Sequence, residues 1–176
     1  NWSISGTTLT VTGTASIQAS VIETALVSGD LSVEANWISI EEDIASNSAN
    51  TLILKSSTYI SANSGTTLST NGGDVIFWAG GSGESYIRPA TITTNGGNVF
   101  MGGTFDAVTD YTWHGHTVPG GYAFSSGNAG VALRGNIDTR VTANPSVGGD
   151  VLIAGESGQT LLGDVCAETQ NRTIST

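Results

Sequence analysis

The sequence predicts an all-β fold, a single-stranded parallel β-helix (β-solenoid) of about seven to eight coils, with roughly 22 residues in each coil. Short apolar runs recur at a nearly constant spacing along the chain. Inside each run, apolar residues alternate with small polar ones. A repeat of roughly 20 to 50 residues is typical of stacked architectures, and two-residue alternation is typical of strands with one buried face.

The first series of expected strands begins at Leu9, Leu31, Leu52, Val75, Val99, Val131 and Val151. Successive starts are nearly evenly spaced, except that the interval from Val99 to Val131 is distinctly longer than the others. Three of these strands follow a Gly-Gly-Asx phrase, at 72–74, 96–98 and 148–150. A second apolar series runs in phase behind the first, at Ile17, Ile38, Ile60, Ile87 and Ile137. Two interleaved series with one period predict coils that stack and bury a shared core.

An antiparallel sandwich or jelly roll is the alternative all-β fold, and it explains the alternation but not the constant period. Helical periodicity is nearly absent. Only residues 40–44 fit a turn of helix, and their acidic side chains are more typical of an exposed corner. We expect one domain over residues 1–176, with a loop insertion at 104–126 and a polar tail at 166–176. The chain is also compatible with being a segment of a longer protein.

The composition excludes some partners. Charged residues make up 11% of the chain, and five basic residues stand against fifteen acidic ones, for a net charge of −10. Nucleic acids and anionic membranes are recognised by clustered Lys and Arg, so neither is expected as a partner. No apolar stretch approaches the roughly 20 residues of a membrane span, so membrane insertion is not expected. The single cysteine, Cys166, cannot form an internal disulfide.

Three stretches resemble the repeats of filamentous-haemagglutinin-type bacterial adhesins, namely 70–79 (TNGGDVIFWA), 94–99 (TNGGNV) and 130–138 (GVALRGNID). The resemblance implies a right-handed parallel β-helix, secretion to the bacterial cell surface, and a role in cell adhesion or filament building. The Asn-Pro-Asn-Leu and Asn-Ser-Asn-Gly signatures of that family's secretion domain are missing, since the one Asn-Pro pair continues with Ser146.

The insertion at 104–126 is the best candidate for a binding loop, because extra residues in one repeat tend to form loops on one face. Its candidate binding residues are Tyr111, Trp113, His114, His116 and Tyr122. Aromatic rings in an exposed loop can stack on sugars or anchor a protein partner. The alternative is that the aromatic side chains fold back as a lid over one flank of the rod.

Metal binding is not the primary expectation. His114, His116, Asp106 and Asp110 have the elements of a transition-metal site, but no further His or Cys accompanies them. Calcium is the other candidate ion, since the chain carries Asp74, Asp138, Asp150 and Asp164, but no contiguous calcium loop is present. We therefore expect no cofactor and no metal site, with calcium as the open alternative.

No catalytic residues are expected. A glycosidase needs two facing carboxylates, and nothing in the sequence pairs Glu84, Asp106 or Asp110. Serine nucleophiles lack a Gly-x-Ser-x-Gly elbow. An ice-binding surface would need the Thr-x-Thr pattern of residues 8–12 at the same phase in every coil, but the equivalent outward positions are Ser32, Ile53 and Ile76.

The function expected from these observations is that of a structural or adhesive rod of a secreted bacterial surface protein. The alternative is a carbohydrate-binding or polysaccharide-degrading β-helix protein. The expected partners are neighbouring coils of a longer chain or a second copy stacked end to end, and host or surface glycans. Open ends of stacked strands favour such association because they present unpaired backbone groups.

Overall fold

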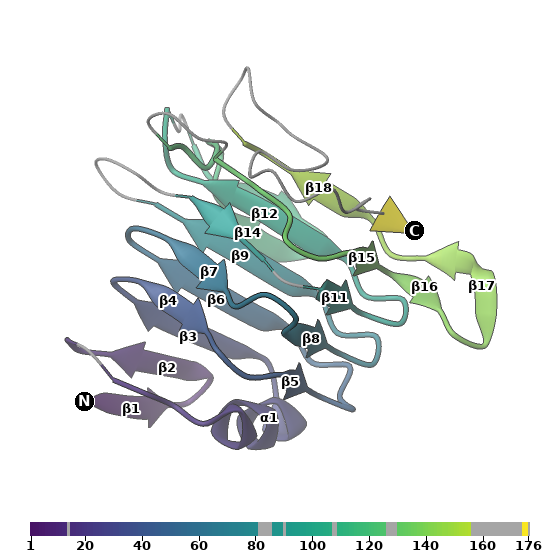
Figure 1. Cartoon of the computed structure of the whole chain (residues 1–176), viewed down its shortest axis with the longest axis horizontal. Coiled ribbons are helices and arrows are strands. Elements are labelled where there is room, and N and C mark those ends of the chain that lie inside the picture. The colour runs from purple at the N-terminus through teal and green to yellow at the C-terminus, as the bar shows by residue number, and fades with distance from the viewer. Residues whose placement is uncertain are drawn as a thin grey trace.

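The computed structural model describes residues 1–13, 15–80, 86–89, 91–106, 109–125 and 130–155, together with the strand at 174–175. Short strands dominate these residues, and they form several small sheets and one larger sheet (Figure 1). Glu84, Ser126, Asp164 and Cys166 lie outside the described residues. So does the predicted tail at 166–176, apart from that last strand.

The largest sheet has seven strands and is mixed. Its order is β1 (Trp2–Ser5), β2 (Thr8–Val11), β3 (Leu31–Ala35), β6 (Leu52–Ser56), β9 (Val75–Ala79), β12 (Val99–Gly103) and β18 (Val151–Ile153). Strand β1 is antiparallel to β2, and the other pairs are parallel. Figure 1 shows these strands one above another, from the N-terminal end to β18.

Two smaller sheets are parallel throughout. One contains β4 (Ile38–Ile40), β7 (Ile60–Ala62) and β10 (Ile87–Arg88), and the other contains β5 (Ile44–Ala45), β8 (Thr67–Ser69), β11 (Thr91–Thr93), β15 (Ile137–Asp138) and β19 (Ile174–Ser175). From β3 to β11 the chain visits the three sheets in turn. We call these three sheets together the three-sheet body.

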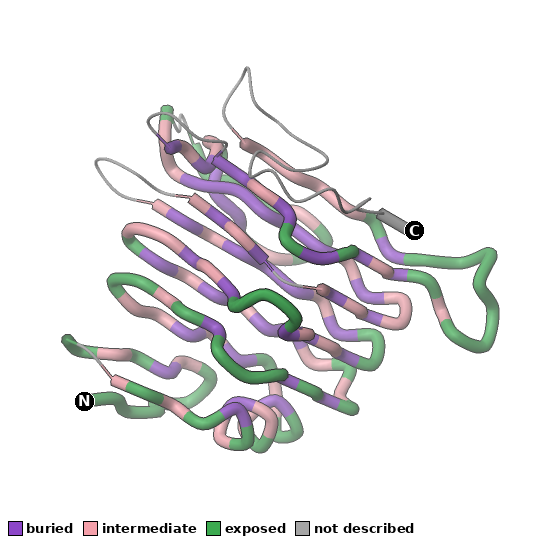
Figure 2. Tube along the Cα trace, in the orientation of Figure 1, coloured by how far each residue is buried: buried purple, intermediate pink, exposed green. Residues whose placement is uncertain are grey.

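Two antiparallel hairpins interrupt this order. The first pairs β13 (Tyr111–Trp113) with β14 (His116–Val118). The second pairs β16 (Arg140–Val141) with β17 (Asn144–Gly148), which is exposed along its whole length and projects from the body (Figures 1 and 2). Both hairpins belong to the part of the chain that connects β12 to β18.

One α-helix, α1 (Ala19–Ser28), lies at the N-terminal end of the body beside β5 (Figure 1). Its buried residues Ala19, Ile22 and Leu26 follow helical spacing. Two hydrogen bonds join the helix to strand β5 and to the segment before β6. The Ala45 amide donates to Glu23 Oε1 at 2.7 Å, and Asn50 Nδ2 donates to the Leu26 carbonyl at 2.7 Å. This helix was not predicted from the sequence.

The predicted fold class, one regular β-helix of about seven to eight coils of similar length, is wrong. The described residues form a mixed seven-stranded sheet, two smaller sheets and two antiparallel hairpins, and an unexpected helix follows Ile17. The physical reason is that several segments pair locally. The antiparallel β1–β2, β13–β14 and β16–β17 pairs each need only a short turn, so they satisfy their backbone groups without a neighbouring repeat.

The expected strand series was also misassigned in its last part. Val131 forms a bridge with Ile87, so it continues the sheet of β10 and not that of β12. Ile137 pairs with Ile92 of β11, in the third sheet. The long interval from Val99 to Val131 therefore joins strands from different sheets, and the true successor of β12 is β18.

Buried residues of the three sheets form the main core, and Figure 2 shows these positions in purple along the strands. In β6 and β9 these are Leu52, Leu54, Val75 and Phe77, each at most 1% exposed. The second glycine of each Gly-Gly-Asx phrase permits the strands to stack closely. A Cβ atom on Gly97 would lie 2.2 Å from the carbonyl oxygen of Gly73. The phrase therefore recurs because the backbones approach too closely there for any side chain.

Candidate functional site

The β13–β14 hairpin carries four of the five residues predicted for binding. Tyr111 pairs with Val118 and Trp113 with His116. The turn between the strands is His114-Gly115, with φ of 45° and 83°. Positive φ at both central residues is the geometry of a tight two-residue hairpin, and the small Gly115 permits it.

The hairpin packs on the outer face of the seven-stranded sheet. Val118 belongs to a second buried cluster with Ile76 and Phe100, against which Ile53, Trp113 and Leu152 pack. The Phe100 ring centroid lies 5.5 Å from that of Trp113 and 6.5 Å from that of Tyr111. Both rings were predicted either to bind a ligand or to fold back as a lid. Their packing supports the lid.

Both histidines contact aspartates at the beginning of strands in that sheet. His116 Nε2 lies 3.0 Å from Asp74 Oδ2 and 3.4 Å from Thr51 Oγ1. His114 Nε2 lies 3.0 Å from Asp150 Oδ2. The His116–Asp74 pair is the better covered, with side chains 20% and 13% exposed, against 38% and 76% for the pair of His114.

The two aspartates belong to a ladder formed by the Asx residues of the three Gly-Gly-Asx phrases, which we call the Asx ladder. Asp74 Oδ1 accepts hydrogen bonds from the backbone amide and side-chain amide of Asn98, at 2.7 and 3.0 Å. Asn98 Oδ1 accepts one from the Asp150 amide at 2.8 Å. His116 contacts Asp74 Oδ2 and His114 contacts Asp150 Oδ2. The hairpin is therefore attached to both ends of the Asx ladder.

The remaining predicted residues lie elsewhere. Tyr122 packs against Phe105, with ring centroids 5.4 Å apart, and not against the hairpin. In the described residues, no hydrogen bond or ion pair joins Asp106 or Asp110 to either histidine. Across the described parts of the chain, no three His, Cys, Asp or Glu side chains cluster as metal ligands would.

Three titrating groups in and near the hairpins have shifted pKa values, and one of them is Arg140, whose pKa is raised by its side-chain hydrogen bond to Asp138. Partial burial raises the pKa of Tyr111 above its ordinary value. A hydrogen bond from the Arg140 side chain lowers the pKa of Asp138, against a smaller opposing effect of burial. Asp138 Oδ2 lies 2.6 Å from Arg140 Nη2, and this pair sits at the base of the β16–β17 hairpin.

A stack of aromatic rings on the three-stranded sheet was missed. Trp37, Tyr59 and Tyr86 each precede the first residue of a strand in that sheet. Their ring centroids are 5.9 and 4.9 Å apart, with interplanar angles of 20° and 7°. Arg88 lies over the Tyr86 ring at 4.3 Å. The signal was visible, because an aromatic residue stands directly before Ile38, Ile60 and Ile87.

A cavity of about 280 Å³ lies beside the first ring of this stack. Buried residues of the core line it, among them Ile22, Val33 and Leu54. Its exposed lining residues include Trp37, Glu41 and Glu42. No Lys, Arg or His side chain is among the described residues that line it.

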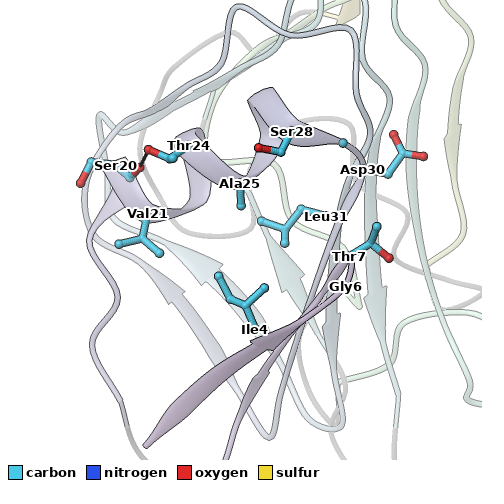
Figure 3. Close-up of a pocket in the computed structure, with 11 residues that line it drawn as sticks. Ile4, Gly6, Thr7, Ser20, Val21, Thr24, Ala25, Ser28, Asp30 and Leu31 are labelled. Atoms are coloured by element: carbon cyan, nitrogen blue, oxygen red, sulfur yellow. Dashed lines mark hydrogen bonds between the residues drawn. The ribbon is translucent and has the colours of Figure 1, made fainter.

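A second hollow of about 490 Å³ lies between helix α1 and the β1–β2 hairpin (Figure 3). Its apolar side is formed by Ile4, Val21, Ala25 and Leu31, and the helix also contributes Ser20, Thr24 and Ser28. Thr24 Oγ1 already donates to the Ser20 carbonyl at 2.7 Å. The one charged residue in its described lining is Asp30, whose Oδ1 accepts a hydrogen bond from the Thr51 amide.

Comparison with protein-family models, with curated proteins and with solved structures gave no match to this chain. In the part of the chain that the structure describes, no helix has the length and apolar character needed to cross a membrane.

Proposed function

We propose that this protein is a secreted bacterial surface protein with a structural or adhesive role, and that it binds without catalysing a reaction. The observation that supports the structural role is the position of the two histidines, which attach the β13–β14 hairpin to the Asx ladder. His114 and His116 are the residues best suited to acid–base chemistry near neutral pH. Each is held 3.0 Å from an aspartate of the Asx ladder.

The acidic residues of the same region support the proposal as well. Asp74 accepts hydrogen bonds from Asn98 in addition to its contact with His116. Asp150 lies at the other end of the ladder, against His114. A glycosidase needs two carboxylates that face one substrate bond. These two carboxylates instead hold a hairpin on a sheet, which is a structural role.

Filament-forming proteins also need contacts between copies. Strand β1 lies at the edge of its sheet, where a strand of another copy could pair with it. It ends the seven-stranded sheet, and in the described residues it pairs on one side only, with β2. Trp2 and Ile4 on this strand are each 43% exposed. An exposed edge with apolar side chains favours association with another strand. We therefore propose that copies associate through β1, which analytical ultracentrifugation with an Ile4→Lys variant tests.

The adhesive role is tested by incubating the purified protein with insoluble polysaccharides and with glycoprotein-coated surfaces. Depletion of protein from solution measures binding, and the appearance of reducing ends or unsaturated sugars measures cleavage. We expect depletion without cleavage. Release of products in proportion to protein concentration would overturn the proposal, and so would a failure to bind any of the surfaces.

A further inference from the structure

The aromatic stack has one end that is covered and one end that is open. Tyr59 lies between Trp37 and Tyr86, so both of its faces are covered, and Arg88 lies over the ring of Tyr86. Trp37 is the last ring of the stack and is 40% exposed. Within the described residues, no ring or cation other than Tyr59 stacks on it.

Trp37, which stacks on Tyr59 alone among the described rings, also borders the cavity of about 280 Å³. Trp37 itself lines the cavity, and so do Gly13, Ala15 and Ser16 from the segment before helix α1. Strand β4, which follows Trp37 directly, is the edge strand of its sheet. A ligand in this space would contact the indole ring together with small residues and apolar residues of the core.

The polar groups of the cavity select against anions. Glu41 and Glu42 are exposed at its mouth, and Ser39 Oγ donates to Glu41 Oε1 at 3.4 Å. Carboxylates accept hydrogen bonds from hydroxyl and ammonium groups and repel other carboxylates and sulfates. The net charge of −10 also repels anionic ligands at longer range.

We propose that this cavity binds a non-acidic pyranose residue of a glycan, stacked on Trp37 with its hydroxyl or amino groups directed to Glu41 and Glu42. A pyranose combines an apolar ring face with a rim of hydroxyl groups, and the cavity combines an aromatic wall with carboxylates. Its volume of about 280 Å³ lies just below the usual range of ligand pockets, which suits one sugar residue. This inference rests on the proposed adhesive role and names its ligand class.

The test is isothermal titration calorimetry of the purified protein with three tetrasaccharides, namely a neutral β-glucan, a glucosamine oligomer and an oligogalacturonate. We expect the first two to bind and the third not to bind. Trp37→Ala should weaken binding about tenfold, because stacking on an aromatic ring is lost. Trp37→Phe should retain most of the affinity.

The matched control is Val147→Ala, which truncates another exposed apolar side chain, 50% exposed against 40% for Trp37, outside the cavity and away from strand β1. It should leave sugar binding unchanged. The Glu41→Gln/Glu42→Gln double variant should weaken binding of the glucosamine oligomer more than that of the neutral glucan, because the carboxylates that attract its ammonium groups are removed. Thermal melting of each variant, followed by circular dichroism, verifies that the fold is intact.

Four results would overturn the inference, and the last of them leaves the adhesive role standing. The first is equal sugar affinity of the Trp37→Ala and Val147→Ala variants. The second is tighter binding of the oligogalacturonate than of the neutral sugar. The third is binding of 1-decanol but of no sugar, which would assign the cavity to an apolar chain. If Trp37→Ala leaves adhesion to surfaces intact, this inference fails while the adhesive role stands.

Discussion

His116 Nε2 lies 3.0 Å from Asp74 Oδ2, although the two residues are 42 positions apart along the chain. Asp74 precedes strand β9, and the same carboxylate accepts hydrogen bonds from Asn98 of the next repeat. One side chain thus joins the ladder that aligns successive strands to the hairpin that covers their outer face. Substitutions in the hairpins and in the sheet beneath them should therefore change the free energy of unfolding or the pKa of a neighbouring group.

His116→Ala should destabilise the protein by about 1 to 2 kcal/mol, because Asp74 Oδ2, on a side chain only 13% exposed, loses the imidazole while Asn98 still bonds Oδ1 alone. His114→Ala should cost less than about 0.5 kcal/mol, since Asp150 is largely exposed and water replaces the contact. Urea denaturation of the two variants measures the difference. Equal effects of the two substitutions would contradict the proposed arrangement of the hairpin.

Phe100→Ala should destabilise the protein by about 3 to 5 kcal/mol, the usual cost of a phenylalanine truncated in a core. Phe100 points to the outer face of its sheet, and it is 0% exposed because the β13–β14 hairpin covers it. Trp37→Ala, which removes a larger ring at an exposed site, should cost about 1 kcal/mol. Thermal or chemical unfolding measures both. A cost below about 1 kcal/mol for Phe100→Ala would mean that the hairpin does not cover the sheet in solution.

Gly97→Ala should destabilise the protein by about 2 to 3 kcal/mol, because the new Cβ atom would overlap the Gly73 carbonyl oxygen at 2.2 Å. The repeats would have to separate to relieve the overlap. Gly29→Ala is the matched control, since nothing lies within 4 Å of its Cβ position and its backbone is extended. The control should change the free energy of unfolding by less than about 0.5 kcal/mol.

Arg140→Gln should raise the pKa of Asp138 toward its ordinary value, because the side-chain hydrogen bond that lowers it is lost. A carboxyl group with a lowered pKa in the folded state contributes stability above its unfolded pKa. That contribution disappears as the pH falls through the folded pKa. The β16–β17 hairpin should therefore loosen locally in acid. An NMR titration of Asp138 in both proteins measures the shift, and identical titration curves would contradict it.

Much of the strand order could be predicted from the sequence, but the fold class could not. Residues 31, 52, 75, 99 and 151 begin strands of one sheet, because a strand with one buried face needs regular alternation of apolar side chains. Alternation alone does not say which neighbour a strand pairs with. The antiparallel hairpins therefore went unrecognised, and Val131 was assigned to the wrong sheet. Helix α1 had a readable signal in Ala19, Ile22 and Leu26, three apolar residues at helical spacing.

The candidate site, like the fold, could be predicted from the sequence only in part. The insertion and its two histidines could be recognised in the sequence, but their partners could not, because Asp74 and Asp150 are distant along the chain and become neighbours only through strand register. One clue was available in the apolar triplets Val75-Ile76-Phe77 and Val99-Phe100-Met101. A strand that is apolar on both faces is covered on both faces, so a covering element was to be expected.

Retention of protein-coated beads on a glycan-bearing surface under flow tests the adhesive account most directly. Beads coated with this protein should be retained in larger numbers than beads coated with an unrelated acidic protein of similar net charge. The surface should remain chemically unchanged after the beads are eluted. Retention no greater than that of the control beads, or loss of sugar from the surface, would contradict the account.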